Sequence, residues 1–184
     1  MEYTVVYSAR RTLGLEIREG KLIVRAPRGT PQSEINRLLQ QKSAWIEKHL
    51  DRSRRRAAEA SAALKLTWEE IEALAKEACD VIPRRVRHYA PLIGVRPGKI
   101  TVRNQRTRWG SCSAQGNLNF NVMLMLAPPR VLDSVVVHEL CHLKEMNHSR
   151  KFYAEIARVF PDYDTCHAWL KEHGSALLAR MPGN

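Results

Sequence analysis

The sequence predicts an α+β protein in which a small, mainly antiparallel sheet packs against helices. Three observations indicate this fold class: apolar residues alternate with a period of two near the N-terminus, they alternate again over 118–122, and the intervening and following segments show helical spacing. The expected order is strands, two helices, strands and then three helices, which is typical of α+β proteins.

The N-terminal segment has alternating apolar residues at 3–7 and 13–17, then a turn at Glu19-Gly20 and a further apolar run. This pattern predicts two or three antiparallel strands with a hairpin at Gly20. Thr30-Pro31 then offers a helix N-cap and a proline at the first helical position. Apolar residues recur every three or four positions through 31–50, which predicts an amphipathic helix.

The stretch 51–66 is rich in small and basic residues and has no apolar period, which indicates a helical extension or an exposed linker. We therefore expect an N-terminal unit of strands and helix with a basic linker at 1–66, and a second domain at 67–184. The second domain begins with a helix whose first turn has a capping box, formed by Thr67 and Glu70. Pro83 is expected to kink or end this helix.

The second domain continues with short strands and ends with three helices. The Pro97-Gly98 turn leads into a strand at 100–102, and Gly116 leads into an alternating strand at 118–122. Pro128-Pro129 then opens a helix whose apolar pattern covers 132–143, and two more helices are predicted around 152–159 and 165–178.

The composition excludes several classes of protein. Hydrophobic residues make up 44% of the 184 residues, with 9 Gly and 9 Pro, which excludes disordered, collagen-like and low-complexity chains. No window of about 18 apolar residues is present, so we expect no membrane partner. The N-terminus MEYTVVYSARR lacks the regions of a cleaved signal, and the four cysteines lack CxxC spacing. These features predict a cytoplasmic protein with reduced thiols.

The charge distribution points to an anionic partner. The formal net charge is +11, and residues 84–108 contain eight basic residues and no acidic one. Such a segment favours nucleic acid, a nucleotide or an acidic peptide as a partner. A basic surface that only confers solubility is the alternative interpretation.

The motif HELCH at 138–142 carries the main functional signal. Each helical residue turns by about 100°, so His138 and His142 differ by about 40° in azimuth and can bind one metal ion from the same face. Glu139 follows the first histidine, where its carboxylate can activate a zinc-bound water as general base instead of binding the ion. Chance placement would produce roughly 0.02 such motifs in this chain, so coincidence is a poor explanation.

A catalytic zinc site needs three protein ligands and one open position. His148 is the favoured third ligand, but on a continuous helix it would point about 120° away from His142, so the helix must end between them. Asn147 can adopt the left-handed conformation and Ser149 can cap the next helix, which would return His148 towards the metal. Glu155 on the following helix is the rival third ligand.

Further motifs surround HELCH along the chain. They are Arg108-Trp109-Gly110-Ser111-Cys112, Leu118-Asn119-Phe120-Asn121, Asn147-His148-Ser149 with Phe152, and the N-terminal Arg10-Arg11-Thr12-Leu13, Val24-Arg25-Ala26-Pro27 and Trp45-Ile46. Together with HELCH they resemble the YgjP-like metallopeptidase domain family, which is related to the WLM and SprT-like zincins. The resemblance covers nearly the whole chain and implies a minimal zincin-like fold. It also implies one Zn²⁺ ion bound by His138, His142 and His148, with Glu139 as general base.

Three functions are compatible with these features. The first is a zinc-dependent peptidase that acts on peptides or proteins, including proteins associated with nucleic acid, as the SprT-like relationship suggests. The second is a metal-dependent hydrolase of nucleoside triphosphates, whose phosphates the basic 84–108 segment would bind. The third is a basic nucleic-acid-binding module with a vestigial metal site, which the intact Glu139 disfavours because zinc binding alone does not require it.

The peptidase hypothesis also predicts how a substrate is held. In zincins an edge strand beside the cleft binds extended substrate through backbone hydrogen bonds, and the candidate strand here lies within 109–121. The developing negative charge on the substrate oxygen needs a stabilising group, for which Arg108, Tyr153 and His167 are candidates.

Overall fold

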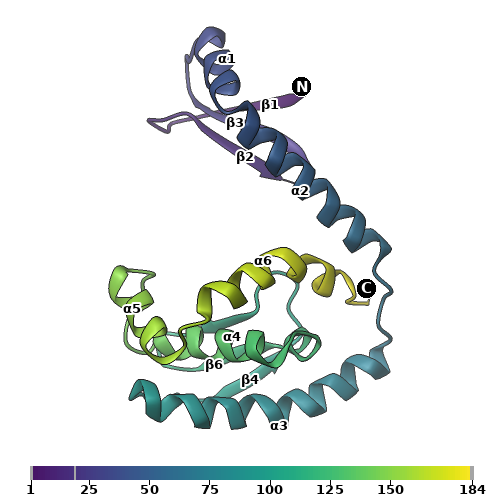
Figure 1. Ribbon diagram of the computed structural model, residues 1–184, viewed down its shortest axis with the longest axis vertical. Helices are drawn as coiled ribbons and strands as arrows, with labels where there is room; N and C mark the ends of the chain where they lie inside the picture. Colours follow the sequence, from purple (N-terminus) through teal and green to yellow (C-terminus); the bar gives the residue numbers. More distant parts are fainter. Residues whose placement is uncertain (1, 19, 183–184) are drawn as a thin grey trace. The chain divides into compact units, whose positions relative to one another are not determined.

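The computed structural model describes residues 2–18 and 20–182, and it has the predicted α+β architecture. The chain forms two compact units, Met1–Ala62 and Ala63–Asn184, each with its own three-stranded sheet (Figure 1). The predicted domains 1–66 and 67–184 stay a prediction, because compactness alone does not show that either part folds independently. Within the described part of the chain, none of the helices combines the length and apolar character that a bilayer span requires.

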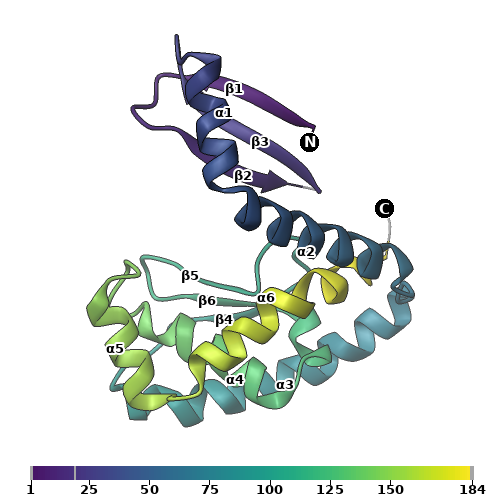
Figure 2. The same ribbon diagram turned by 45° about the horizontal axis from the view of Figure 1, so that its top comes forward.

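The N-terminal sheet consists of β1 (Tyr3–Ser8), β2 (Gly14–Arg18) and β3 (Lys21–Pro27), with β3 in the middle (Figure 2). β2 and β3 form the predicted antiparallel hairpin around Gly20, and Glu19 of the predicted turn lies outside the described residues. β1 instead runs parallel to β3. The sheet is therefore mixed, because turn residues specify which strands form a hairpin but not which strand occupies the centre.

Two helices cover this sheet, α1 (Gln32–Gln41) and α2 (Ser43–Ala62), where the sequence predicts one helix over 31–50. Thr30 does not cap α1, because its hydroxyl donates a hydrogen bond to the Pro27 carbonyl at 2.8 Å. α2 continues to Ala62, so the first part of the predicted linker is a helical extension. The core of this unit consists of buried apolar side chains from β3 and the two helices: Leu22, Val24, Ala26, Ile35, Ile46 and Leu50.

The second unit also has a mixed sheet, with one parallel and one antiparallel pair of strands. Its strands are β4 (Ile100–Arg103), β5 (Gly110–Cys112) and β6 (Leu118–Asn121). β6 is central, parallel to β4 and antiparallel to β5, so β5 is an edge strand. The helical elements are α3 (Trp68–Ile93), the short 3-10 helix η1 (Val122–Leu126), α4 (Pro129–Cys141), α5 (Arg150–Val159) and α6 (Tyr163–Ala179).

Helix α3 begins with the predicted capping box of Thr67 and Glu70, but it continues through Pro83 and Pro91 instead of ending near Pro83. A proline in a helix interior removes a hydrogen bond and costs about 3 kcal/mol. Burial of one face of α3 against α4, η1 and β4 outweighs this cost. The buried residues on that face are Ala78, Ile82, Val86, Tyr89, Ala90 and Ile93.

Helix α4 lies in the interior of this unit, where α3, α5, α6 and β5 all contact it. Most of its side chains are buried, which is typical of a helix that is apolar on nearly every side. Its buried polar groups therefore need partners or a function. Asp133 accepts a hydrogen bond from the Tyr89 hydroxyl at 3.1 Å, and the Ser134 hydroxyl donates to the Val131 carbonyl at 2.7 Å. Glu139, which is 5% exposed, belongs to the candidate site.

Candidate metal centre

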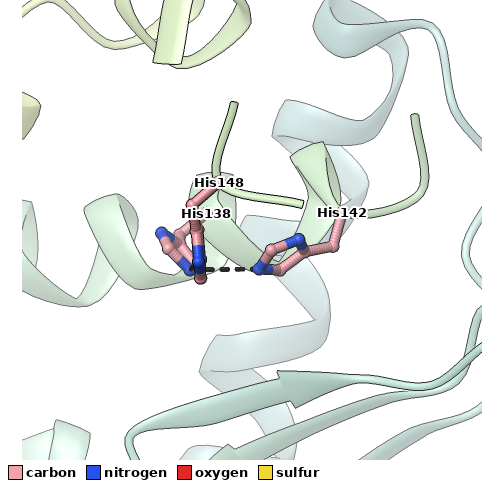
Figure 3. Close-up of side chains that lie close together, drawn as sticks. All are labelled: His138, His142 and His148. Atoms are coloured by element: carbon pink, nitrogen blue, oxygen red, sulfur yellow. Dashed lines mark hydrogen bonds between the residues drawn. The ribbon is translucent and has the colours of Figure 1, made fainter. Parts of the chain in front are cut away.

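The end of α4 brings two of the predicted ligands together. His138 lies in the last turn of α4 and His142 follows its last residue, still with helical backbone angles. Their Nε2 atoms lie 3.2 Å apart, as the four-residue spacing predicts (Figure 3).

His148 reaches the same point from the segment that follows α4. Ser149 begins α5 as its N-cap, with its hydroxyl accepting a hydrogen bond from the Phe152 amide at 3.3 Å, as predicted. The chain has therefore left the α4 direction before His148, whose Nε2 lies 3.2 Å from Nε2 of His138. Figure 3 shows the three imidazoles directed towards a common point.

The three histidines form a cluster that could hold a metal ion. One ring nitrogen from each lies within 4.8 Å of the others, and no further His, Cys, Asp or Glu of the described chain joins this group. Two nitrogen ligands of tetrahedral zinc, each about 2.0–2.1 Å from the ion, are separated by about 3.3 Å. The two Nε2 separations that His138 makes, each 3.2 Å, match that value, so the donor type and these two separations fit zinc.

The rival ligand Glu155 lies outside the cluster. Its carboxylate forms ion pairs with Lys144 at 2.8 Å and Arg158 at 2.7 Å. Hydrogen bonds from Arg158 and then Lys144 lower the pKa of this carboxyl to about 2, so it is ionised and already neutralised by two cations. The structure thus gathers His148, and not Glu155, with His138 and His142.

Hydrogen bonds at Nδ1 orient two of the rings. Nδ1 of His142 lies 3.1 Å from the Glu145 carbonyl oxygen, which can only accept, so Nδ1 carries the proton and Nε2 keeps its lone pair. Nδ1 of His138 lies 2.8 Å from the hydroxyl of Tyr163 at the start of α6. The fully buried Phe152 packs against all three imidazoles, with ring centroids 4.6–5.0 Å away. These contacts hold the rings in place before any ion binds.

The half-buried His138 is held neutral by its surroundings. Burial, and then the nearby His142 and His148, lower the pKa of His138 to about 3. A neutral imidazole is the form that binds a metal ion, so the site requires no deprotonation of His138 at neutral pH.

Glu139 lies beside His138 on α4 and against the backbone of β5. A Cβ atom placed on Gly110 would lie 2.6 Å from Oε1 of Glu139, so only glycine at this position lets the strand approach so closely. Burial raises the pKa of the Glu139 carboxyl to about 8. A buried carboxyl with a raised pKa next to histidines that could hold a metal ion has the properties expected of a general base.

Sequence reasoning singled out Tyr153 and His167 near this site but missed Tyr163. The Tyr153 ring lies 6.2 Å from the His148 ring, and His167 stacks on Tyr163 at 5.6 Å. Arg108 and His167 line a pocket together with His138 and Glu139. No local pattern marks Tyr163, because its contact with His138 spans 25 residues of sequence and arises only when α6 packs on α4.

The basic segment 84–108 is divided between the end of α3, strand β4 and the connecting loops. Two of its arginines are paired with carboxylates, Arg84 with Asp80 and Arg85 with Asp133. Its proposed role in binding nucleic acid or a nucleotide stays a prediction.

Comparisons with known proteins identify the family of the chain. The model of the family described as "YgjP-like, metallopeptidase domain" matches residues 11–71 and 65–173, and no curated protein matches the chain. The zymogen of the Pyrococcus abyssi metallopeptidase abylysin is 21% identical, with a TM-score of 0.45 over 50% of this chain and 93% of that chain. The zymogen of Methanocaldococcus jannaschii jannalysin is also 21% identical, with a TM-score of 0.44 over 49% of this chain and 93% of that one. Because the family model spans most of the sequence, including all three clustered histidines, the chain belongs to the YgjP-like family of metallopeptidase domains.

Proposed function

We propose that this protein is a zinc-dependent peptidase in which His138, His142 and His148 hold one Zn²⁺ ion and Glu139 is the general base. The observation that carries this proposal is the convergence of three Nε2 atoms, two of the separations being 3.2 Å, beside a buried carboxyl. All four residues lie in the second unit, so we assign the activity to the predicted domain 67–184.

The residues of the chain have distinct roles in this proposal. When bound, the ion supplies a Lewis acid that polarises a carbonyl oxygen and lowers the pKa of a water molecule. Glu139 accepts the proton of that water and then donates it to the departing amine nitrogen. Burial raises the pKa of Glu139, whereas a cation bound beside it would lower that pKa. The two opposing effects together place the pKa in a range that suits proton transfer near neutral pH.

The sheet provides a way to bind an extended peptide. β5 is an edge strand of its sheet and contacts α4, the helix that carries Glu139. Backbone amides and carbonyls along an edge strand can pair with a peptide and position its bond for attack. This arrangement supports a peptide substrate for the site.

Metal content and turnover test this proposal together. We expect about one zinc per chain by elemental analysis of the purified protein, and hydrolysis of casein when zinc is present. Glu139→Gln is expected to retain zinc but lose hydrolysis, because the carboxamide cannot accept the proton. Hydrolysis of nucleoside triphosphates, with no cleavage of casein or peptides, would contradict the proposal and favour a nucleotide hydrolase.

The third ligand is tested by a matched pair of variants. His148→Ala removes one of three nitrogen donors and is expected to abolish stoichiometric zinc binding. Glu155→Gln is expected to bind zinc as the parent protein does, because its carboxylate is paired with Lys144 and Arg158. Loss of zinc from Glu155→Gln with retention in His148→Ala would assign the third ligand to Glu155.

A further inference from the structure

A pocket of about 270 Å³ adjoins the candidate site on the side of His138 and Glu139. His138 and Glu139 are part of its wall, whereas His142 and His148 are not. A group that enters this pocket therefore lies next to the general base and beside the first histidine.

Large apolar side chains form part of the pocket wall. Its walls include Trp109, which precedes β5, Val135 of α4 and Leu170 of α6. The indole of Trp109 packs closely on α6, since a Cβ atom placed on Gly174 would lie 2.9 Å from its Cζ2 atom. Ser134 also lines the pocket, but its hydroxyl already donates a hydrogen bond to the Val131 carbonyl. The Tyr163 hydroxyl, also in the lining, contacts Nδ1 of His138, so neither of these two hydroxyls is left for a ligand.

Apart from the Glu139 carboxyl, the charged side chain in the pocket lining is a positive one, that of Arg108. Arg108 lines the pocket with an exposed side chain, and its guanidinium has no carboxylate partner among the described residues. Two imidazoles, those of His138 and His167, also line the pocket. A lysine or arginine side chain entering here would lose hydration against apolar walls and would meet the positive charge of Arg108.

The volume suits one amino-acid side chain. An apolar protein cavity of about 150 Å³ is large enough to hold benzene. Sites for whole drug-sized ligands begin at about 300 Å³. A pocket of about 270 Å³ therefore accepts a side chain up to the size of a large aromatic residue, but not a whole peptide segment.

We infer that this pocket is the subsite for the substrate side chain beside the scissile bond, and that it selects large apolar side chains and rejects basic ones. The inference rests on the proposed peptidase function. Trp109, Val135 and Leu170 determine the preference for apolar groups, and Arg108 determines the exclusion of lysine and arginine.

Cleavage of a peptide library by the zinc-loaded full chain, with the products identified by mass spectrometry, tests the inference. We expect bonds flanked on one side by Leu, Met or Phe to be cleaved about tenfold or more faster than bonds with Lys or Arg in that position. Arg108→Glu is expected to increase cleavage at Lys and Arg by about fivefold relative to the parent protein. Arg87→Glu is the matched control, because it makes the same charge change at an exposed position outside the pocket lining.

A second pair of variants tests the size of the pocket. Leu170→Phe fills part of the space and is expected to shift the preference towards smaller apolar residues. Because Leu170 is 8% exposed and the larger ring could disturb folding, Thr107→Tyr fills the pocket from its exposed rim. Either variant should leave zinc content unchanged.

The possible failures are distinguishable. Cleavage without an apolar preference, or an Arg108→Glu profile identical to that of the parent, would overturn the subsite while leaving the peptidase function intact. Failure of the zinc-loaded chain to cleave any peptide would overturn the proposed function itself. Peptide affinity for the Glu139→Gln variant, measured by fluorescence anisotropy, reports on the pocket without turnover. Equal affinity for apolar and basic peptides there would also overturn the subsite.

Discussion

The hydroxyl of Tyr163, at the start of α6, lies 2.8 Å from Nδ1 of His138 on α4. The two rings are nearly parallel, at 14°, with centroids 5.9 Å apart. Tyr163 is buried, so its hydroxyl has few other partners. When the hydroxyl accepts the Nδ1 proton, Nε2 of His138 keeps the lone pair that a metal ion needs.

Tyr163→Phe should therefore weaken metal binding without removing a ligand. We expect a loss of zinc affinity of about 10- to 100-fold, because His138 loses the group that fixes its tautomer and orientation. Competition with a chromophoric chelator measures this affinity independently of turnover. Tyr153→Phe is the control, since the Tyr153 ring lies near His148 but is exposed. Equal affinities for both variants would show that Tyr163 only fills space.

Gly110→Ala should affect turnover more than zinc binding. The added Cβ would lie 2.6 Å from Oε1 and 2.7 Å from Cγ of Glu139, so the carboxylate or the strand must move. A displacement of about 1 Å at a reacting group costs about 100-fold in rate. We expect a fall of that order in kcat with zinc content unchanged. Ser111→Ala, which removes atoms from the same strand, should retain most activity, and full activity in Gly110→Ala would refute the close approach.

Glu155 should make the stability of the protein depend on pH in the acid range. Folding lowers the pKa of this carboxyl from 4.5 to about 2, so the folded state favours its ionised form. The stabilisation is fully present above about pH 4.5 and is lost as the pH falls towards 2. Because both cationic partners are about half exposed, we expect about 1 kcal/mol at neutral pH.

Urea unfolding of Glu155→Gln measures this contribution. The variant should be less stable than the parent protein at pH 7, with the difference shrinking as the pH falls below about 4.5. Glu72→Gln is the control, because the Glu72–Lys76 pair is exposed on α3 and should contribute less than about 0.5 kcal/mol. A difference for Glu155→Gln that stays constant from pH 7 to pH 3 would contradict the prediction.

Pro83→Ala should stabilise the protein. Pro83 lies inside α3, where alanine restores a backbone donor and fits the helical conformation already present. We expect the free energy of unfolding to rise by about 1–3 kcal/mol, measured by urea denaturation. Pro91→Ala, in the last turn of α3 where a helix frays most readily, should have a smaller effect. A decrease in stability for Pro83→Ala would show that the proline ring contributes packing that exceeds the lost hydrogen bond.

Much of the candidate site could be predicted from the sequence because its signals are local. His138 and His142 share a face through the helical repeat, and the N-cap at Ser149 marks the start of the helix after His148. The α+β class likewise follows from apolar periods that act over a few residues. The strand order of the two mixed sheets could not be predicted from these local patterns. In each sheet the last strand in sequence, β3 or β6, lies between the two strands that precede it.

The sequence by itself predicted the histidine pair, the neighbouring carboxyl and the type of most main elements, because helix periodicity and capping depend on residues within one or two turns. Only the tertiary structure decided that His148 and not Glu155 joins the cluster, that Tyr163 contacts His138, and that Gly110 lies against Glu139. It also decided that α3 passes through Pro83. These outcomes depend on which faces pack together, and packing joins residues whose separation in sequence carries no periodic signal.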